Sequence, residues 1–173
     1  MTNVELAMNR FLGCLILISG LIFSVQPAAA QRAASSLEHW HTGGIGLSTP
    51  MGFNLGVSYS IVVKGPLFVQ ASVTTSKDVY ITKHSTFLVG PAIGLRQYTD
   101  VALTSLSVGP TYLRGTRGAD LLAPGSSYET ASITLTAQMI FLETNMGFEL
   151  FTNFNSVRNV SGLRLIYRLG SFR

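Results

Sequence analysis

Hydrophobic and polar residues alternate with a period of two along most of the chain. In the stretch GFNLGVSYSIVV, at residues 52–63, every second position is apolar and most positions between are glycine, asparagine or serine. This period is typical of a β-strand, in which successive side chains point to opposite faces of a sheet. The same alternation returns in LFVQASVTT, VALTSLSVGPTYL, SITLTAQMIF, MGFELFTNF and SGLRLIYRLG. The pattern therefore predicts an all-β protein without a helix of useful length from Trp40 onward.

The alternation divides into eight predicted strands joined by connections of unequal length. We predict strands at residues 41–49, 52–63, 66–75, 86–97, 101–113, 130–142, 145–155 and 160–170. Some connections are very short, such as Lys64-Gly65, whereas residues 76–85 and 114–129 are long. In an up-and-down antiparallel sheet, the two long connections fall at the same end, and the three connections at the other end are all short. Two further connections at the long-connection end, at residues 50–51 and 156–159, are also short.

The first thirty residues have the features of an export signal. The stretch RFLGCLILISGLIFSVQPAAA contains a basic residue, an apolar run of about fifteen residues and a small-residue end at Ala28–Ala30. We predict a signal peptide at residues 1–30, a polar lead at 31–39 and one domain at 40–173; Met1 and Met8 both stay open as the start. Cleavage removes Cys14, the only cysteine, so the mature protein has no disulfide.

The composition indicates which face of the sheet meets which medium. Only 12% of the residues are charged, against about 25% in ordinary soluble domains. The polar face consists of small neutral residues, which do not resemble a solvated exterior. If the apolar face meets lipid instead, strands of this length cross a bilayer and closure of the sheet removes its unpaired edges. With eight strands the lumen is narrow enough for side chains to fill it.

Charged residues on the polar face predict ion pairs inside the barrel. Arg164 and Arg168 share the face of Gly162 and Gly170 in the last strand, so we expect both in the lumen. Antiparallel pairing of the last two strands would bring Glu149 close to position 164 or 166. Arg96 is a third cation on an inward face. We therefore predict a lumen ion-pair network of Arg96, Glu149, Arg164 and Arg168, because an unpaired charge in the interior is costly.

Aromatic residues near the strand ends predict two interfacial girdles. An up-and-down path from Trp40 places Trp40, Phe141 and Phe172 toward one rim and Phe53, Tyr112 and Phe154 toward the other. Aromatic belts at both membrane interfaces are typical of membrane barrels. The alternative is that aromatic residues simply favour strands.

On its signal peptide, its amphipathic strands and its last strand LRLIYRLGSF, the chain resembles the small eight-stranded outer-membrane β-barrels of gram-negative bacteria over residues 40–173. The resemblance implies insertion by the outer-membrane assembly machinery, outer-membrane lipid and lipopolysaccharide as neighbours, and both termini in the periplasm. We expect a monomer. The chain departs from the pattern at its end, because Phe172 is followed by Arg173 and is out of phase with Leu165, Tyr167 and Leu169.

Residues that could support chemistry are few. The net charge of +4 comes from scattered basic residues, which argues against nucleic-acid binding. His84-Ser85 differs from the lipid A deacylases, whose His and Ser lie two positions apart on one strand face, and the imidazoles of His39 and His41 lack a third metal ligand. We therefore expect no enzyme activity, no metal and no cofactor.

Arg114 and Arg117, in the longest connection, are candidates for contact with lipopolysaccharide phosphates, with an ordinary solvated loop as the alternative. Two main functions stay open. The first is a non-enzymatic outer-membrane barrel that acts in envelope integrity or surface interaction through its loops. The second is a soluble, lipocalin-like carrier with an apolar interior. A lipid-A-modifying enzyme is a third and weaker alternative.

Overall fold

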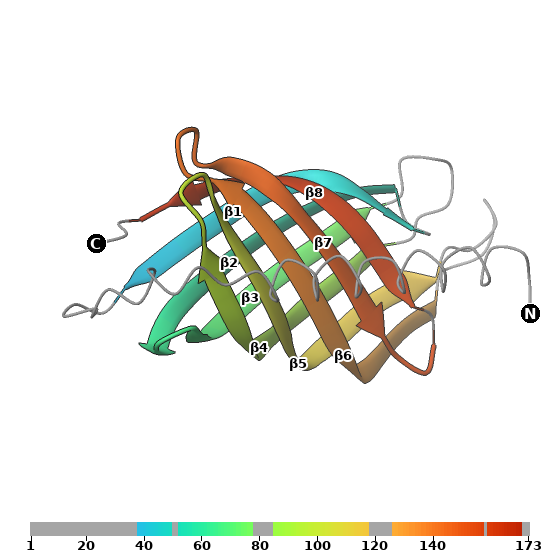
Figure 1. The fold of residues 1–173 in the computed structure, drawn as a ribbon. Helices are drawn as coiled ribbons and strands as arrows, with labels where there is room; N and C mark the ends of the chain where they lie inside the picture. The colour runs from blue at the N-terminus through green and yellow to red at the C-terminus, as the bar shows by residue number, and fades with distance from the viewer. Residues whose placement is uncertain (1–37, 50–51, 78–84, 118–125, 158, 171–173) are drawn as a thin grey trace, which may run out of the picture. The chain divides into compact units, whose positions relative to one another are not determined.

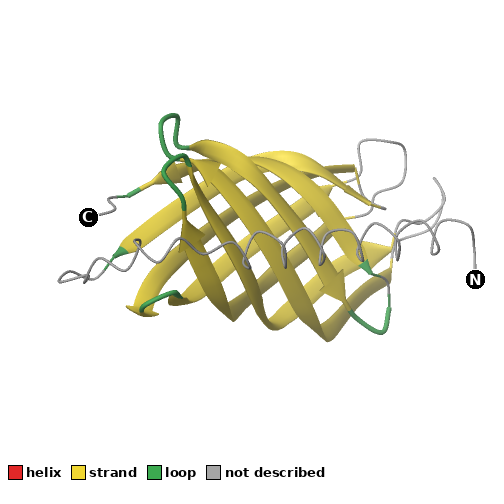
Figure 2. Cartoon of the chain, viewed as in Figure 1, coloured by secondary structure: helices red, strands yellow, loops and turns green. Residues whose placement is uncertain are grey.

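The structure is a computed structural model that describes residues 38–49, 52–77, 85–117, 126–157 and 159–170. Within these ranges the chain forms eight strands (Figure 1). They are β1 (His39–Thr49), β2 (Gly52–Lys64), β3 (Leu67–Lys77), β4 (Ser85–Tyr98), β5 (Ala102–Arg117), β6 (Ser126–Phe141), β7 (Met146–Phe154) and β8 (Val160–Leu169). Strands account for nearly all of the described chain, and the turns that the structure describes between them are short (Figure 2). No helix among the described residues has the length and apolarity needed to cross a membrane.

The eight strands form one closed antiparallel barrel. Each strand pairs with the next along the chain, and β1 also pairs with β8. Closure satisfies the backbone groups that an open sheet would leave unpaired at its edges. The predicted fold class, an antiparallel up-and-down barrel of eight strands, is confirmed.

The pairing register winds around the barrel as a spiral. Starting at Arg96 on β4 and moving to the register partner on each successive strand, the path returns to β4 at Thr86, ten residues from its start. The path runs through Arg96, Ser105, Gln138, Glu149, Arg164, Gly46, Asn54, Ser76 and Thr86. We call these inward positions the polar row. A stagger of this kind is what allows a tilted sheet to close.

The strand boundaries agree with the predicted ones except at the ends of β5 and β6. Both strands extend four residues further toward the long connection than the alternation indicates. The ladder between them continues from Arg114↔Glu129 to Arg117↔Ser126. The short connection after β6 depends on Asn145, whose φ of 56° lies in the left-handed region that asparagine tolerates. The predicted signal peptide lies outside the described residues, as does most of the polar lead.

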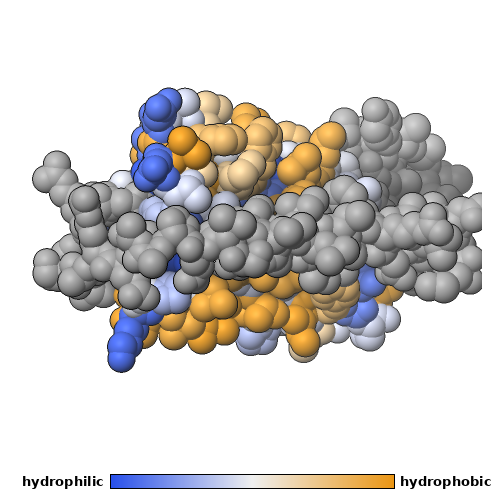
Figure 3. All heavy atoms as spheres, viewed as in Figure 1, coloured by the Kyte–Doolittle hydropathy of each residue, from blue (hydrophilic) through white to orange (hydrophobic). Residues whose placement is uncertain are grey.

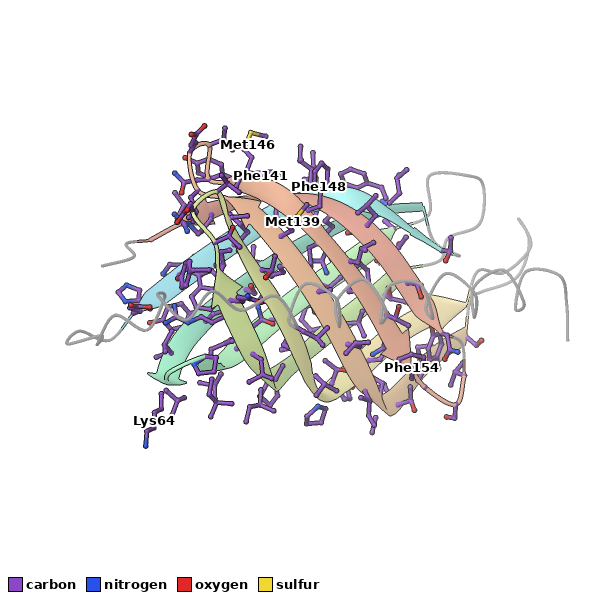
Figure 4. The ribbon with its side chains drawn as sticks, viewed as in Figure 1. Lys64, Met139, Phe141, Met146, Phe148 and Phe154 are labelled. Atoms are coloured by element: carbon purple, nitrogen blue, oxygen red, sulfur yellow. The ribbon has the colours of Figure 1, made fainter. Side chains whose placement is uncertain are left out.

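The outer surface of the barrel is a broad apolar band. Ile45, Leu47, Val57 and Ile133 are each at least half exposed, and the space-filling view shows apolar residues between two more polar ends (Figure 3). Side chains such as Phe148 project outward from the strands (Figure 4). An apolar surface that continues from strand to strand is far larger than the patches that soluble monomers expose. The outer surface of the barrel is therefore suited to contact with the hydrocarbon core of a membrane.

The interior contains two apolar clusters, one toward each end of the barrel. The first, near the short turns, consists of Trp40, Phe68, Leu103, Ile140 and Ile166. The second, toward the long connections, consists of Leu88, Leu113, Phe151 and Val160. We call them the short-turn cluster and the long-loop cluster. The polar side chains of the interior lie mainly between them, so the barrel is filled with side chains along its axis.

Candidate functional site

An ion pair occupies the middle of the barrel interior. Arg164 Nη2 lies 2.8 Å from Glu149 Oε1, and both side chains are about 6% exposed. The second carboxylate oxygen of Glu149 accepts a hydrogen bond from Gln138 Nε2 at 2.6 Å. Arg164 also donates to the hydroxyl of Thr74 at 3.0 Å, and its guanidinium lies 4.4 Å from the ring centre of Phe151. The charges are therefore paired and held by several neighbours at once.

The other two predicted lumen cations have different partners. Arg96 forms an ion pair with Glu38, donates to the hydroxyl of Tyr98 at 2.7 Å, and lies over the rings of Trp40 and Tyr98. Arg168 donates to the side chain of Asn145 in the β6–β7 turn.

The register explains this separation of the three cations. Arg96 begins the polar row, several strands away from Arg164, and Arg168 lies four residues further along β8. At about 3.3 Å per residue, four residues along a strand amount to about 13 Å. Sequence reasoning missed the role of Glu38, although Glu38, Trp40 and Thr42 share one parity and Thr42 belongs to the polar face.

Neutral polar groups fill most of the remaining interior. Gln70 donates to Ser58 and Ser60 and accepts from Ser107. Asn153 donates to three hydroxyls, those of Thr111, Ser132 and Thr134. The cavity beside Arg164 has a volume of about 10 Å³, which is the lower limit for one water molecule. This cavity therefore holds at most one water molecule.

The part of the polar row nearest the long connections differs from the rest. Asn54, Ser76 and Thr86 lie side by side on β2, β3 and β4 and are at most 2% exposed. In the described structure, neither the amide of Asn54 nor the two hydroxyls has a hydrogen-bond partner. These three side chains therefore add polarity to the interior without the stabilisation that a paired group supplies.

Most of the predicted girdle residues face outward, but Trp40 does not. Phe53, Tyr112, Phe141 and Phe154 are between 39% and 44% exposed. Trp40 is fully buried inside the barrel, with its ring 5.2 Å from that of Phe68. The prediction that Trp40 belongs to a girdle was wrong, because it rested only on the position of Trp40 near a strand end. It did not consider which face of the strand carries the Trp40 side chain. Phe172 lies outside the described residues.

The long-loop rim carries outward-facing charge. Arg114 Nε lies 3.6 Å from Glu129 Oε1, with both side chains more than half exposed. Lys77 is also exposed, at the end of β3. The backbone of Arg117 belongs to β5, but its side chain lies outside the described part of the structure. The structure thus places Arg114 on the outer surface of a strand, where the sequence had suggested a loop.

The residues considered for metal binding or catalysis are only partly described in the structure. Within the described ranges no group of three or more His, Cys, Asp or Glu side chains could hold a metal ion. The hydroxyl of Ser85 is 2.9 Å from that of Thr116, and His84 lies outside the described residues. The interior also differs from that of a lipocalin-like carrier, because charges and amides line its middle, between the two apolar clusters, while most of the large apolar side chains face outward.

Several solved structures match the barrel, and two of them illustrate the likeness. Neisserial surface protein A (NspA) matches with a TM-score of 0.55 and 14% sequence identity, over 78% of this chain and 96% of that chain. Ail, the attachment invasion locus protein of Yersinia pestis, matches with a TM-score of 0.52 and 12% identity, over 78% of this chain and 99% of that chain. No protein-family model matches the sequence, and no curated protein matches it significantly. The likeness shows that the fold is that of the small outer-membrane β-barrels.

Proposed function

We propose that the protein is a non-enzymatic outer-membrane barrel with a closed interior, acting in envelope integrity or surface interaction through its long-loop end. The observation that carries the proposal is the combination of an apolar outer band with an interior filled by two apolar clusters and a paired polar centre. Such a barrel needs lipid around it and leaves no path for a solute. Its remaining surface for specific contacts is the rim and the connections beyond it.

Lipopolysaccharide is the partner that the long-loop rim fits best. Because long connections are extracellular in bacterial barrels, Lys77 and Arg114 would lie at the outer leaflet. Exposed cations there can form charge-assisted hydrogen bonds with phosphate groups. In the related fold, Ail was solved in complex with sucrose octasulfate, a heparin analogue and therefore a polyanion.

The rim contact is tested by comparing cations at opposite ends of the barrel. In Lys77→Gln combined with Arg114→Gln we expect several-fold less lipopolysaccharide to copurify with the folded barrel. Lys64→Gln is the matched control, because Lys64 is exposed at the short-turn end, where its side chain points away from the barrel (Figure 4). Equal loss in the control would mean that the rim cations have no specific role.

The wider proposal is tested on the whole protein. Density separation should recover it with the outer membrane, and planar-bilayer recording should show no steady conductance. A gene deletion should increase sensitivity to detergents or reduce surface attachment, and the wild-type gene should reverse the defect. Recovery as a monodisperse soluble protein without detergent, or channels of nanosiemens size, would contradict the proposal.

A further inference from the structure

Three ring side chains gather on the outer face of the barrel where β1 begins. The imidazole of His41 stacks on the ring of Tyr59 with their centres 4.6 Å apart. The imidazole of His39 lies 6.0 Å from Tyr59 and 6.3 Å from His41, measured between ring centres. We call these three residues the imidazole cluster. Both histidines in the described part of the chain belong to it, although the rest of the outer band is apolar.

In the proposed outer-membrane location, the cluster would lie at the depth of the lipid headgroups. His39 is the first residue of β1, and His41 follows two residues later on the same face. Two residues of a strand tilted by about 45° correspond to roughly 5 Å along the membrane normal. Tyr59 is the register partner of His41 on β2. Beyond Tyr59, β2 continues to the exposed Lys64 at the short-turn end. All three rings therefore lie near the short-turn end of the barrel, which corresponds to the interfacial layer in the proposed location.

The surface next to the cluster is open toward the membrane centre. Gly43 is the next outward position on β1, with Val57 and Tyr167 as its register partners. A Cβ added at Gly43 would meet no atom within 4 Å, so the strand has no side chain there. Apolar side chains on both sides, among them Val57 at 59% and Tyr167 at 49% exposed, leave a lipid-facing gap directly below the cluster.

We propose that this face binds one phospholipid molecule of the periplasmic leaflet. An imidazole has at least one N–H donor in either protonation state, and a phenol has an O–H donor, so the cluster can donate hydrogen bonds to a phosphodiester. One acyl chain then lies in the gap over Gly43, between the apolar surfaces of Val57 and Tyr167. The inference rests on the proposed outer-membrane location, and it adds a defined lipid site to the periplasmic side.

The experiment measures phospholipid retention on the purified wild-type protein in mild detergent, by native mass spectrometry with added phosphatidylethanolamine. His39→Phe with His41→Phe keeps the aromatic rings and removes the nitrogen donors. Gly43→Leu keeps the donors and fills the gap. Each variant should bind the lipid about tenfold more weakly, which corresponds to the loss of one or two hydrogen bonds or of the chain contact. Tyr112→Phe, at the opposite rim, should bind it as the wild type does.

Several outcomes would overturn the site. Wild-type retention by the double histidine variant would exclude the imidazoles as donors, and wild-type retention by Gly43→Leu would exclude the chain position. Binding of soluble glycerophosphoethanolamine as tight as that of the lipid would assign the site to a free phosphate ester. Heat-modifiable gel mobility checks that each variant is folded. If the folded wild-type barrel retains no lipid, this inference fails alone, whereas a soluble wild-type protein would refute the outer-membrane location.

Discussion

Replacing Glu149 by leucine tests whether the barrel depends on its central ion pair. Glu149 and Arg164 are register partners on β7 and β8, with 2.8 Å between the nearest nitrogen and oxygen. The leucine side chain would leave the Arg164 guanidinium buried with the Thr74 hydroxyl and the Phe151 ring beside it, but without a counter-charge. It would also remove the acceptor of the Gln138 amide.

The size of the effect follows from the geometry. Opposite unit charges about 4 Å apart interact by about 4 kcal/mol at an effective dielectric of about 20. Removing one member of a buried pair costs about 3 to 5 kcal/mol, because the other charge stays desolvated. We therefore expect Glu149→Leu to lower the free energy of unfolding by about 3 to 5 kcal/mol. Arg164→Leu should have a similar effect, since it leaves the carboxylate alone.

The assay is urea unfolding in lipid vesicles, followed by the fluorescence of the single tryptophan, Trp40, which is buried in the barrel. The double variant, Glu149→Leu with Arg164→Leu, should lose less stability than the two single losses added together, with a coupling of up to about 3 kcal/mol. Leu165→Arg is a comparison at a lipid-facing position, where an arginine should cost about 2 to 4 kcal/mol for a different reason. If Glu149→Leu is neutral while Arg164→Leu stabilises the protein, the paired interior described here is wrong.

Three further predictions concern single positions. A Cβ at Gly56 would overlap the Arg164 guanidinium, whereas one at Gly43 would meet no atom within 4 Å. In urea unfolding, Gly56→Ala should therefore destabilise the protein by about 1 to 3 kcal/mol and Gly43→Ala by less than about 0.5 kcal/mol. Equal effects of the two variants would contradict the packing around Arg164. Trp40 fluorescence should resist quenching by brominated lipids because the ring faces the interior, and strong quenching would restore the interfacial assignment. Asn54→Leu should change the unfolding free energy by less than about 1 kcal/mol, because its amide has no partner in the described structure; a loss of several kcal/mol would show that it has one.

The sequence was sufficient for the fold and for the orientation of the strand faces. Alternation of small polar and apolar residues distinguishes inside from outside because the strand period is two. The sequence could place Glu149 near position 164 or 166, because the short connection restricts the register of the last two strands. The structure selects Arg164 as its register partner. The four exposed girdle residues follow from the same parity.

The apolar ends of the interior could not be recognised from the alternation of neighbours alone. Phe68 lies between Leu67 and Val69, and Ile166 lies between Leu165 and Tyr167, so the sequence there is a continuous apolar run with no contrast between faces. The information is in the longer phase, because Phe68 shares its parity with Gln70 and Ile166 with Arg164. Parity with Thr42 places Glu38 on the inward side, but its pairing with Arg96 depends on packing between β1 and β4 that parity does not specify.

The distribution of inward residues explains how a barrel in lipid obtains a stable core. Outside, contact with hydrocarbon supplies little hydrophobic drive between side chains, because lipid tails are as apolar as leucine. The two apolar clusters instead exclude water at both ends of the lumen, near the aqueous phases where burial is favourable. Between them, low water access strengthens the Glu149–Arg164 pair and makes an unpaired partner costly. The polar row runs from the region of one cluster to the region of the other, and the Glu149–Arg164 pair lies at its middle. Removing a charge from this buried pair should therefore lower stability more than removing a charge from the exposed pair of Arg114 and Glu129 at the rim.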